Sequence, residues 1–517
     1  MGEQFLKNIL TQSEVASDAT AQDLAAPADD SFVPEMTIDI IKKRAIGGVA
    51  ALTMRRIVLK VISFSGEVIL ARLLTPEIFG IFTIVSFMVN FFGFFGDVGL
   101  GAALIQKKEK LTDDDLKTTF TIQQLLVGVI TIVLFVTSPL LSRLYGGEES
   151  LSMTWLFRVM SLSLFISSFK VIPSILLERV LKFNLLIIPE ILEVISFQVI
   201  AIGMALSGYG VWSFVYATIV SRVIGMLSLF ILSPWRVTLG LDLRAAKELF
   251  RFGLPYQLIG IIGLMKDGVT PIFVGMLLGA QAVGYLNWAT TFAFLPLMII
   301  QVLNRITFPA FSRVQHDRIL LKKGIEKAIK FTGIVFFPIA FISIGLAKPI
   351  VHYVYTDKWL SAMPAFYLTS ISILFTTSIS ATFFNAYYAV GKSKLCLKLM
   401  ILYLIVDWTF GVPFVLSYGY IGIAMARVVN AFVNLPLSIY LMNRIVKIDI
   451  LKNISTPLLS ASIMGIILYF AAPFVVTGIP SLALAVLVGV IIYTATLYIA
   501  DISSIREDIR GASQLFR

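Results

Sequence analysis

Long apolar stretches recur along this chain from about residue 46 to residue 500, and they constrain the fold more than any other feature. A helix needs about 20 consecutive apolar residues to cross the hydrocarbon core of a bilayer. Stretches of this kind cover residues 46–74, 79–106, 118–143, 151–177, 184–207, 210–234, 248–278, 283–308, 328–347, 362–389, 394–417, 419–442, 456–476 and 480–500. We therefore predict an all-α polytopic membrane protein with about 14 transmembrane helices, of which the first and seventh carry charges.

Composition excludes the classes of soluble protein. Hydrophobic residues make up 58% of the chain and charged residues only 14%, against about 25% charged residues in an ordinary globular domain. The net charge of +11 therefore indicates membrane topology, and we expect no nucleic-acid partner. A single cysteine, Cys396, and two histidines exclude a disulfide framework and a Cys- or His-rich metal site, so we expect no bound metal or cofactor.

The distribution of basic residues predicts the orientation in the membrane. If both termini are cytoplasmic, thirty Lys and Arg residues lie in cytoplasmic segments, and the three in outside segments are Arg143, Lys348 and Lys358. Such an excess is typical of cytoplasmic loops. Residues 1–44 and 503–517 are then cytoplasmic tails, and the first of them is acidic and of a composition typical of disorder.

A weak internal repeat divides the helices into halves. Residues 73–80 (LLTPEIFG) match residues 277–284 (LLGAQAVG) in the paired leucines and the final glycine, at an offset of 204. The Tyr-Gly pair at 209–210 matches that at 418–419. We therefore predict two six-helix lobes in parallel orientation, residues 45–236 and 237–445, followed by two further helices in residues 446–502. Repeats of this kind place a transporter's substrate cavity between them, and Gly80 and Gly284 are candidate gate linkers.

The chain carries no motif that indicates an enzyme. It has no complete Walker A loop and no HExxH, GxSxG or CxxC motif. No predicted outside loop exceeds about 20 residues, whereas membrane polymerases of sugar chains usually carry a large external loop. These absences favour a transporter over a catalyst.

Charges in the first and seventh predicted helices are the candidate substrate ligands: Arg55, Arg56, Lys60, Glu67, Arg72, Lys266 and Asp267. Arg56, Lys60 and Glu67 share one helical stripe, which is costly against lipid and so predicts a wet cavity. Cationic side chains there suit a diphosphate. Two alternatives stay open: the basic residues near the cytoplasmic end reach the headgroups, and Lys266 and Asp267 neutralise one another.

A second set of intramembrane charges serves ion coupling or structural pairing: Asp97, Asp407, Glu193, Arg222 and Arg427. A buried carboxyl can carry a coupling proton, so H⁺ and Na⁺ are both open as the coupling ion. The alternative is that each acid is the structural partner of a nearby arginine.

Several separated motifs resemble one known family. Residues 69–80 (ILARLLTPEIFG), 97–106 (DVGLGAALIQ), 176–179 (LLER) and 209–212 (YGVW) are similar to those of the polysaccharide transporter family, the Wzx-like flippases of the multidrug/oligosaccharidyl-lipid/polysaccharide superfamily. The resemblance covers roughly residues 45–445. It implies two six-helix lobes around a central cavity lined by the first, second, seventh and eighth helices.

The resemblance also implies a function, which is the translocation of a polyprenyl-diphosphate-linked oligosaccharide across the bacterial inner membrane by alternating access. The glycan would be an exopolysaccharide, capsule or lipopolysaccharide O-antigen repeat unit, and membrane lipids are further partners. The basic cytoplasmic loops bind anionic lipid headgroups or dock a polysaccharide polymerase or glycosyltransferase. The main alternative is an ion-coupled exporter of small drugs or organic cations on the same fold, and a membrane glycosyltransferase or polymerase is the less favoured one.

Overall fold

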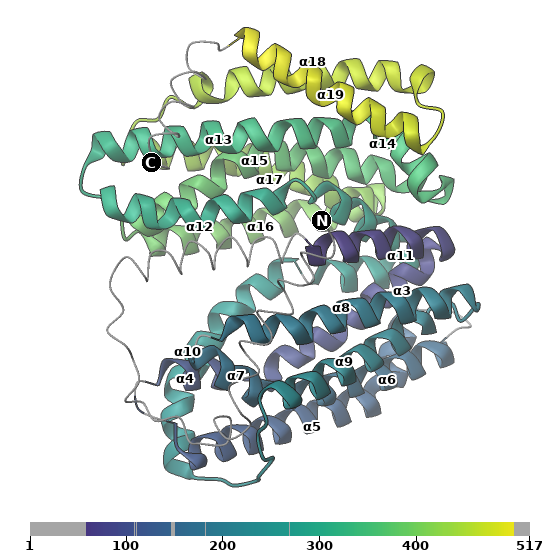
Figure 1. Ribbon diagram of the computed structural model, residues 1–517, viewed down its shortest axis with the longest axis vertical. Coiled ribbons are helices and arrows are strands. Elements are labelled where there is room, and N and C mark those ends of the chain that lie inside the picture. Colours follow the sequence, from purple (N-terminus) through teal and green to yellow (C-terminus); the bar gives the residue numbers. More distant parts are fainter. Residues whose placement is uncertain are drawn as a thin grey trace, which may run out of the picture. The chain divides into compact units, whose positions relative to one another are not determined.

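The computed structural model describes residues 58–107, 109, 111–145, 150–180, 182–267 and 269–500. All regular elements in these ranges are helical, which confirms the predicted all-α fold (Figure 1). Both predicted cytoplasmic tails, 1–44 and 503–517, lie outside the described residues. The described residues from 59 onward belong to one compact unit.

Residues 58–73 are helical. The helices that follow are α3 (Pro76–Gly93), α4 (Leu100–Gln106), α5 (Asp113–Leu144), α6 (Ser150–Ser168), α7 (Val171–Arg179), α8 (Phe183–Leu206), α9 (Trp212–Leu232), α10 (Leu243–Asp267), α11 (Val269–Ala293), α12 (Leu297–Val314), α13 (Arg318–Gly345), α15 (Met363–Ala389), α16 (Ser393–Tyr418), α17 (Ile421–Asn443), α18 (Ile450–Val475) and α19 (Ile479–Ala500). Short helical segments, η2 (Ile350–Tyr355) and η3 (Asp357–Ala362), connect α13 to α15.

The described helices support a multi-pass membrane protein. Eleven of them are long and apolar enough to cross a membrane, or twelve if the bent pair Asp357–Leu374 and Ile379–Ala389 forms one span. The first predicted span, 46–74, begins outside the described residues. The multi-pass fold is therefore confirmed, and the count of 14 spans stays a prediction.

The backbone departs from helical geometry at the linker before the eighth predicted span and within the second predicted span. α11 is kinked at Gly279 (φ 79°, ψ 175°), so the segment matched to the first linker does join two helical parts. The second span is interrupted between α3 and α4, where Val98 and Gly99 have φ angles of 48° and 74°. A left-handed conformation is rare for a β-branched residue such as valine, so sequence patterning did not predict this break.

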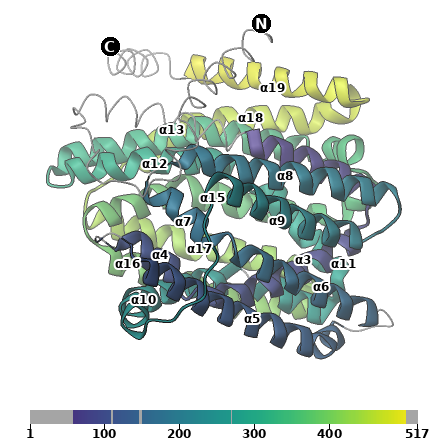
Figure 2. The same ribbon diagram turned by 60° about the horizontal axis from the view of Figure 1, so that its bottom comes forward.

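Helix packing shows how the two predicted lobes are built and joined. In the first, α5 packs on α6, α8 on α9, and α6 on both α3 and α9. In the second, α15, α16 and α17 pack together with α12 and α13, and α18 lies along α13 with α19 beside it (Figure 2). Between them, α3 packs on α11 and α4 packs on α10. The lobe boundary at residue 236 stays a prediction.

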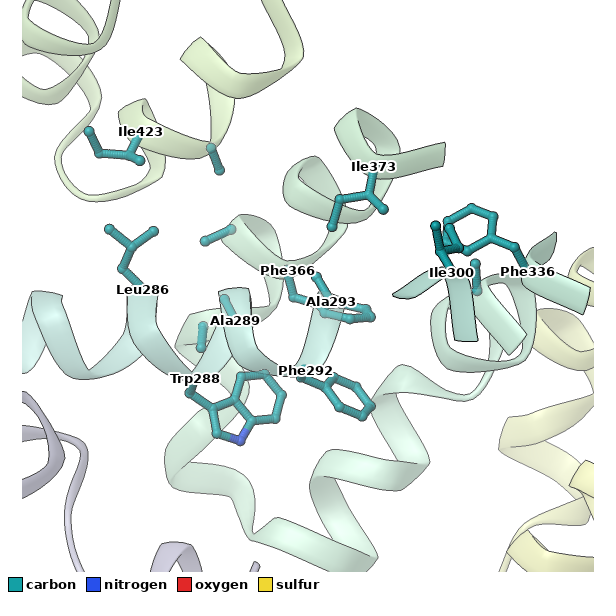
Figure 3. Packing of buried hydrophobic residues seen from close by; sticks show 14 of the residues in the cluster. Leu286, Trp288, Ala289, Phe292, Ala293, Ile300, Phe336, Phe366, Ile373 and Ile423 are labelled. Atoms are coloured by element: carbon teal, nitrogen blue, oxygen red, sulfur yellow. The ribbon is translucent and has the colours of Figure 1, made fainter. Parts of the chain in front are cut away.

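One buried apolar cluster reaches across both predicted lobes. Its members include Ile84 of α3, Trp288 of α11, Phe336 of α13 and Phe366 of α15. Figure 3 shows Trp288 and Phe292 projecting from the same side of their helix. Because apolar packing continues from α3 through α11 to α15, the cavity described below has rigid walls on both sides.

Candidate functional site

A cavity of about 490 Å³ lies where the helix 58–73, α3, α8, α9 and α11 meet. Its walls are mainly aromatic. Phe82 stacks on Phe214 with a centroid distance of 4.4 Å, and Trp288 stacks on Trp359 at 5.7 Å. Pockets of this size, with apolar walls and a few polar groups, are typical of small-molecule sites.

The polar groups of this central cavity are mostly uncharged. Asn90, Gln198, Asn287 and Thr291 contribute amide and hydroxyl groups. Among the described residues that line it, Glu67 is the one carboxylate, and none is Lys, Arg or His. The charge of Lys60, seven residues earlier on the same helix, acts on Glu67 without an ion pair between them.

A second cavity of about 360 Å³ adjoins the first inside the predicted first lobe and shares Glu67, Asn90 and Gln198 with it. Its far wall contains Glu193 of α8 and Arg222 of α9. Glu193 accepts a short hydrogen bond from Lys170 and lies 3.4 Å from an Arg222 guanidinium nitrogen. One carboxylate is thus held between two cations, and the Arg222 contact is the looser of the two.

Besides the apolar cluster that spans both predicted lobes, the described residues join the lobes by a close contact at each end of the helices. We call the end with residues 73–80 and 277–284 the linker end, and the end with residues 106–113 and 232–243 the basic end. Most of the residues of α3 that line the central cavity, from Phe82 to Asn90, fall between these two contacts.

The contact at the linker end is made by close packing of backbone. A Cβ on Gly80 would lie 1.7 Å from the Ala280 carbonyl oxygen, and one on Gly284 would lie 1.8 Å from that of Pro76. Only glycine therefore permits this approach. Both predicted gate linkers thus meet in one contact.

Hydrogen bonds to the end of the helix 58–73 extend the linker-end contact. The buried Trp359 indole nitrogen donates to the Ala71 carbonyl at 2.9 Å. Lys358 Nζ donates to the Arg72 carbonyl at 2.8 Å, and the Arg72 guanidinium donates to the Tyr353 carbonyl at 2.9 Å. η2 and η3 are in this way fixed against the first lobe.

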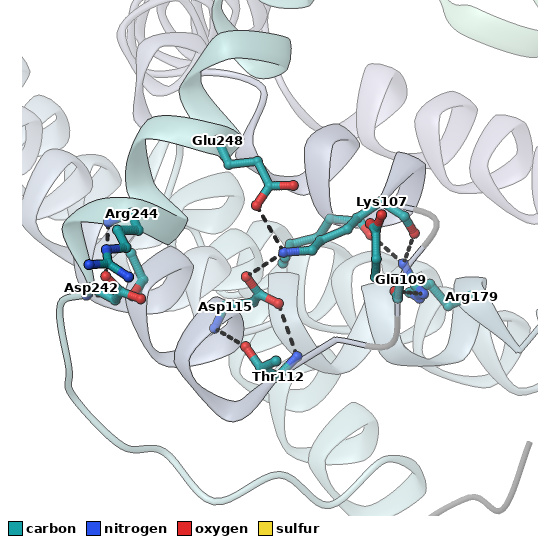
Figure 4. A network of polar contacts seen from close by, with 10 residues as sticks. Lys107, Glu109, Thr112, Asp115, Arg179, Asp242, Arg244 and Glu248 are labelled. Carbon is teal, nitrogen blue, oxygen red and sulfur yellow. Dashed lines mark hydrogen bonds and ion pairs between the residues drawn. The ribbon is translucent and has the colours of Figure 1, made fainter.

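The contact at the basic end combines a backbone approach with ion pairs (Figure 4). A Cβ on Gly99 would lie 2.2 Å from the Gly253 carbonyl oxygen. Lys107 Nζ lies 3.0 Å from Asp115 and 3.1 Å from Glu248 of α10. Burial alone would lower the pKa of Lys107, but the hydrogen bonds and charges of the two carboxylates outweigh it and raise that pKa.

Arg179 completes the basic-end network from α7. Its guanidinium donates to the Leu104 and Lys107 carbonyls, both at 2.7 Å, and to the Glu109 carbonyl at 3.0 Å. The loop that carries Lys107 is thereby held in place for the contact with α10.

The predicted substrate residues are spread over three places. Glu67 lines both cavities, whereas Arg72 lies at the linker end and donates to backbone carbonyls. Lys60 lies on the same helix outside the described lining. Arg55 and Arg56, and the side chains of Lys266 and Asp267, lie outside the described part of the chain.

The residues predicted for ion coupling or structural pairing also lie in different places. Glu193 and Arg222 come together as described. Asp97 accepts a hydrogen bond from the Gly101 amide at 3.2 Å, so it caps the start of α4 after the break. Asp407 of α16 and Arg427 of α17 lie outside the described lining of both cavities, and Arg427 donates to Thr290 at 2.9 Å.

Sequence reasoning missed the uncharged residues of the central cavity, above all Asn90, Gln198, Asn287 and Trp288. A search limited to ionisable residues passes over them. Amide side chains within otherwise apolar helices were the available signal, because such groups are costly in lipid unless they face protein or water.

Comparison with known families identifies the chain. Residues 69–364 match the model of the family described as "Polysaccharide biosynthesis protein". The chain belongs to this family. The match extends from the helix 58–73 to the second residue of α15. It contains both contacts and most of the lining of both cavities, and it leaves out Ser63, Phe64 and Glu67.

Curated relatives of this family member carry out steps of polysaccharide synthesis or transport, according to their names. The chain is 24% identical to the succinoglycan biosynthesis transport protein ExoT of Rhizobium meliloti over 85% of this chain and 90% of the relative. It is 24% identical to the teichuronic acid biosynthesis protein TuaB of Bacillus subtilis, over 72% and 77%. For the lipopolysaccharide biosynthesis protein WzxC of Escherichia coli, identity is 22% over 64% and 67%.

Solved structures support the fold. The lipid II flippase MurJ in an inward closed conformation matches with a TM-score of 0.74 and 17% identity, over 88% of this chain and all of that chain. An inward-facing MATE family transporter of the MOP superfamily matches with a TM-score of 0.58 and 18% identity, over 76% and 98%. The fold is therefore that of transporters, as the sequence predicted.

Proposed function

We propose that this protein is a flippase that moves a polyprenyl-diphosphate-linked oligosaccharide across the bacterial inner membrane by alternating access. One observation carries the proposal: in a member of a polysaccharide biosynthesis family, a cavity of about 490 Å³ lies between two separate contacts of the lobes. Opening one contact while the other stays closed exposes the cavity to one side at a time.

The orientation follows from charge. Lys107, Arg179 and Arg244 belong to the basic end, and basic loops favour the cytoplasm. The linker end is then outside and both termini are cytoplasmic. In this orientation the substrate enters past the Lys107 contact and leaves past the Gly80–Gly284 contact.

The diphosphate is proposed to bind the cations of the first and seventh predicted helices. Arg55, Arg56 and Lys60 lie toward the cytoplasmic end of the first helix, and Lys266 lies at the matching part of the second lobe. Arginine binds phosphate as a bidentate fork and lysine as a point charge. Reversal of Lys60 or Arg56 to glutamate should abolish glycan export and leave membrane insertion intact, and normal export by both variants would remove this assignment.

Coupling is proposed to use H⁺ or Na⁺, with Glu193 as the carboxylate that exchanges partners. Lys170 and Arg222 hold Glu193 at the edge of the side cavity. Glu193→Gln should therefore remove the dependence of transport on the ion gradient.

A second function, the export of organic cations, is favoured by one specific observation. The central cavity has aromatic walls and a single carboxylate, Glu67, among its described lining. Aromatic faces and an acid suit a cation. The two functions differ in what accumulates when the protein is removed.

The deciding experiment is depletion of the protein in its host. Full-length lipid-linked repeat units should accumulate in the inner leaflet, protected from a membrane-impermeant glycan-cleaving enzyme. Composition analysis of that material identifies the glycan. Continued export of polymer without such accumulation would contradict the flippase proposal and leave the organic-cation exporter.

The proposed partners of the basic cytoplasmic segments are anionic lipids and enzymes of glycan synthesis. The basic loops at the cytoplasmic side would bind anionic lipid headgroups, and a polysaccharide polymerase and glycosyltransferases are expected to act before and after the flipping step. Co-purification of these enzymes with the wild-type protein, measured against a variant in which the basic residues of the segment 313–330 are neutralised, tests for direct contact.

A further inference from the structure

Three buried polar atoms of the central cavity have no hydrogen-bond partner among the described residues. They are Ser86 Oγ, Gln198 Oε1 and Trp288 Nε1, and all three residues line this cavity. Buried polar groups in folded proteins nearly always have partners. The Trp288 donor and the Ser86 hydroxyl, both without a protein partner in the walls of one cavity, therefore indicate that a polar, uncharged ligand or water completes them.

The open atoms are held in fixed directions. Trp288 is 7% exposed and packs between Trp359 and Phe292, so its indole N–H cannot turn away. The Gln198 amide nitrogen donates to the Ser63 carbonyl at 3.3 Å, and its oxygen lies against Gly66 of the same helix, because a Cβ on Gly66 would be 2.0 Å from it. Fixed donors and acceptors of this kind give a site its specificity.

The walls suit the faces of a sugar ring. Phe82, Phe197 and Phe214 form a stack on one side, with centroid distances of 4.4 to 6.5 Å, and Trp288 and Phe292 lie on α11. Flat aromatic surfaces bury apolar area, and a pyranose offers C–H faces for such surfaces and hydroxyls around its edge. Asn90 and Asn287 add amide groups for those hydroxyls.

The charge of the cavity lining favours neutral sugars over acidic ones. Glu67 is the one carboxylate of the described lining, and the lining contains no described basic side chain. A carboxylate accepts hydrogen bonds from hydroxyls strongly, but it repels a second anion. A uronic acid or a phosphate is therefore disfavoured in this cavity.

We propose that the central cavity binds an uncharged pyranose of the lipid-linked glycan, held by Trp288 Nε1, Asn287 and Glu67, and that the diphosphate lies outside it. This inference rests on the proposed flippase function and adds specificity-determining residues to it. It predicts that the glycan carries a neutral sugar at the position that occupies the cavity.

Binding of short alkyl glycosides tests the proposal with purified full-length protein in lipid nanodiscs. The probes share a hexyl tail and differ in the head: β-glucoside, β-galactoside, α-mannoside, N-acetyl-β-glucosaminide, β-glucuronide and trimethylammonium. At least one neutral glycoside should bind at least tenfold more tightly than the glucuronide. Equal or tighter binding of the glucuronide or of the ammonium probe, or no binding of any glycoside, would overturn the inference.

Variants locate the site. Trp288→Phe keeps a ring and removes the N–H, so it should weaken the neutral glycoside about five- to tenfold. The matched control is the same change at Trp408 of α16, which packs edge-on against Phe273 of α11 and lies outside the described lining. This control should have no effect on binding. An unchanged affinity in Trp288→Phe would contradict the assignment.

If Trp288→Phe fails to fold, Glu67→Gln and Asn287→Ala test the site in its place. We expect both variants to fold, because Glu67 is part-buried and Asn287 is exposed. Glu67→Gln should bring the glucuronide to within about threefold of the glucoside, and Asn287→Ala should weaken the glucoside. If neither variant alters binding, the sugar lies elsewhere. Inner-leaflet glycan accumulation on depletion together with no glycoside binding would reject this inference alone, whereas no accumulation would reject the flippase itself.

Discussion

The two contacts between the lobes are built from different interactions. The linker end closes through backbone packing at Gly80 and Gly284 and through the buried indole of Trp359. The basic end has a backbone approach at Gly99, hydrogen bonds from the Gly240 and Asp242 amides to threonines of α5, and the ion pair of Lys107 with Glu248. Packing is insensitive to salt, whereas exposed ion pairs weaken with salt, so the two ends should respond differently to solution conditions.

This difference also indicates which contact is harder to open. Glu248 is 60% exposed and holds Lys107 from the side of α10, and exposed ion pairs contribute little. The linker end buries a tryptophan that is 0% exposed. We therefore expect the basic end to open first in the resting protein.

The largest effect is expected at the linker end. Gly80→Ala places a methyl group 1.7 Å from the Ala280 carbonyl oxygen, and overpacking of this kind costs about 3 kcal/mol. Thermal unfolding of the detergent-solubilised protein should show a clear loss, together with loss of glycan export. The control is Gly203→Ala, since a Cβ there has nothing within 4 Å; equal stability of the two variants would refute close packing at this end.

Trp359→Phe should have the next largest effect. It removes the hydrogen bond to the buried Ala71 carbonyl, which costs about 1.5 kcal/mol. Trp155→Phe, at a side chain that is 48% exposed, is the matched control in the same unfolding measurement. A loss no greater than in this control would show that the indole acts by packing alone.

Glu248→Gln should weaken only the basic end, by less than about 1 kcal/mol. Spin labels at Gln106 and Leu254, both exposed, report the separation of α4 and α10 by pulsed electron resonance. We expect a larger open population in the variant, and a similar shift in the wild type at high salt. If the distance distribution is the same in the variant and at high salt as in the wild type at low salt, the ion pair does not hold this contact closed.

High pH should open the same contact. The pKa of Lys107 is raised overall, because the hydrogen bonds that it donates to Asp115 and Glu248, together with the charges of these carboxylates, outweigh the effect of burial. The stabilisation is therefore complete below the usual lysine pKa of about 10.4 and is lost as the pH rises through the higher folded value. The same spin-label pair should show a closed end at pH 9, and opening already at that pH would contradict the network.

The smallest effect is expected for an ion pair that does not join the two predicted lobes. Asp449, before α18, lies 2.8 Å from Lys322 of α13, and this hydrogen bond lowers the pKa of Asp449. Both side chains are largely solvated, so Asp449→Asn should leave unfolding and the label distances unchanged. An effect as large as that of Glu248→Gln would mean that surface charge in general, not the contact, controls opening.

The sequence predicted the membrane fold and the linkers because both depend on local chemistry. Apolar length predicts a spanning helix wherever it occurs, and the repeated glycine at 80 and 284 was visible as a pattern. The same reasoning placed Arg72 among the substrate ligands, whereas its guanidinium binds the carbonyls of η2 at the linker end. The position of a charged residue on a helix face does not show which segment, distant in the sequence, packs against that face.

What the sequence determined by itself is therefore the helical, multi-pass class, the family and the excess of basic residues at one end. Only the tertiary structure decided that Glu193 lies between Lys170 and Arg222, and that Trp288, Gln198 and Glu67 surround one cavity. The physical reason is the separation along the chain over which each kind of interaction acts. Hydropathy and turn chemistry act between neighbours along the chain, whereas a cavity is made by side chains from helices up to about 290 residues apart, between Phe64 and Tyr355, and their packing alone brings those side chains together.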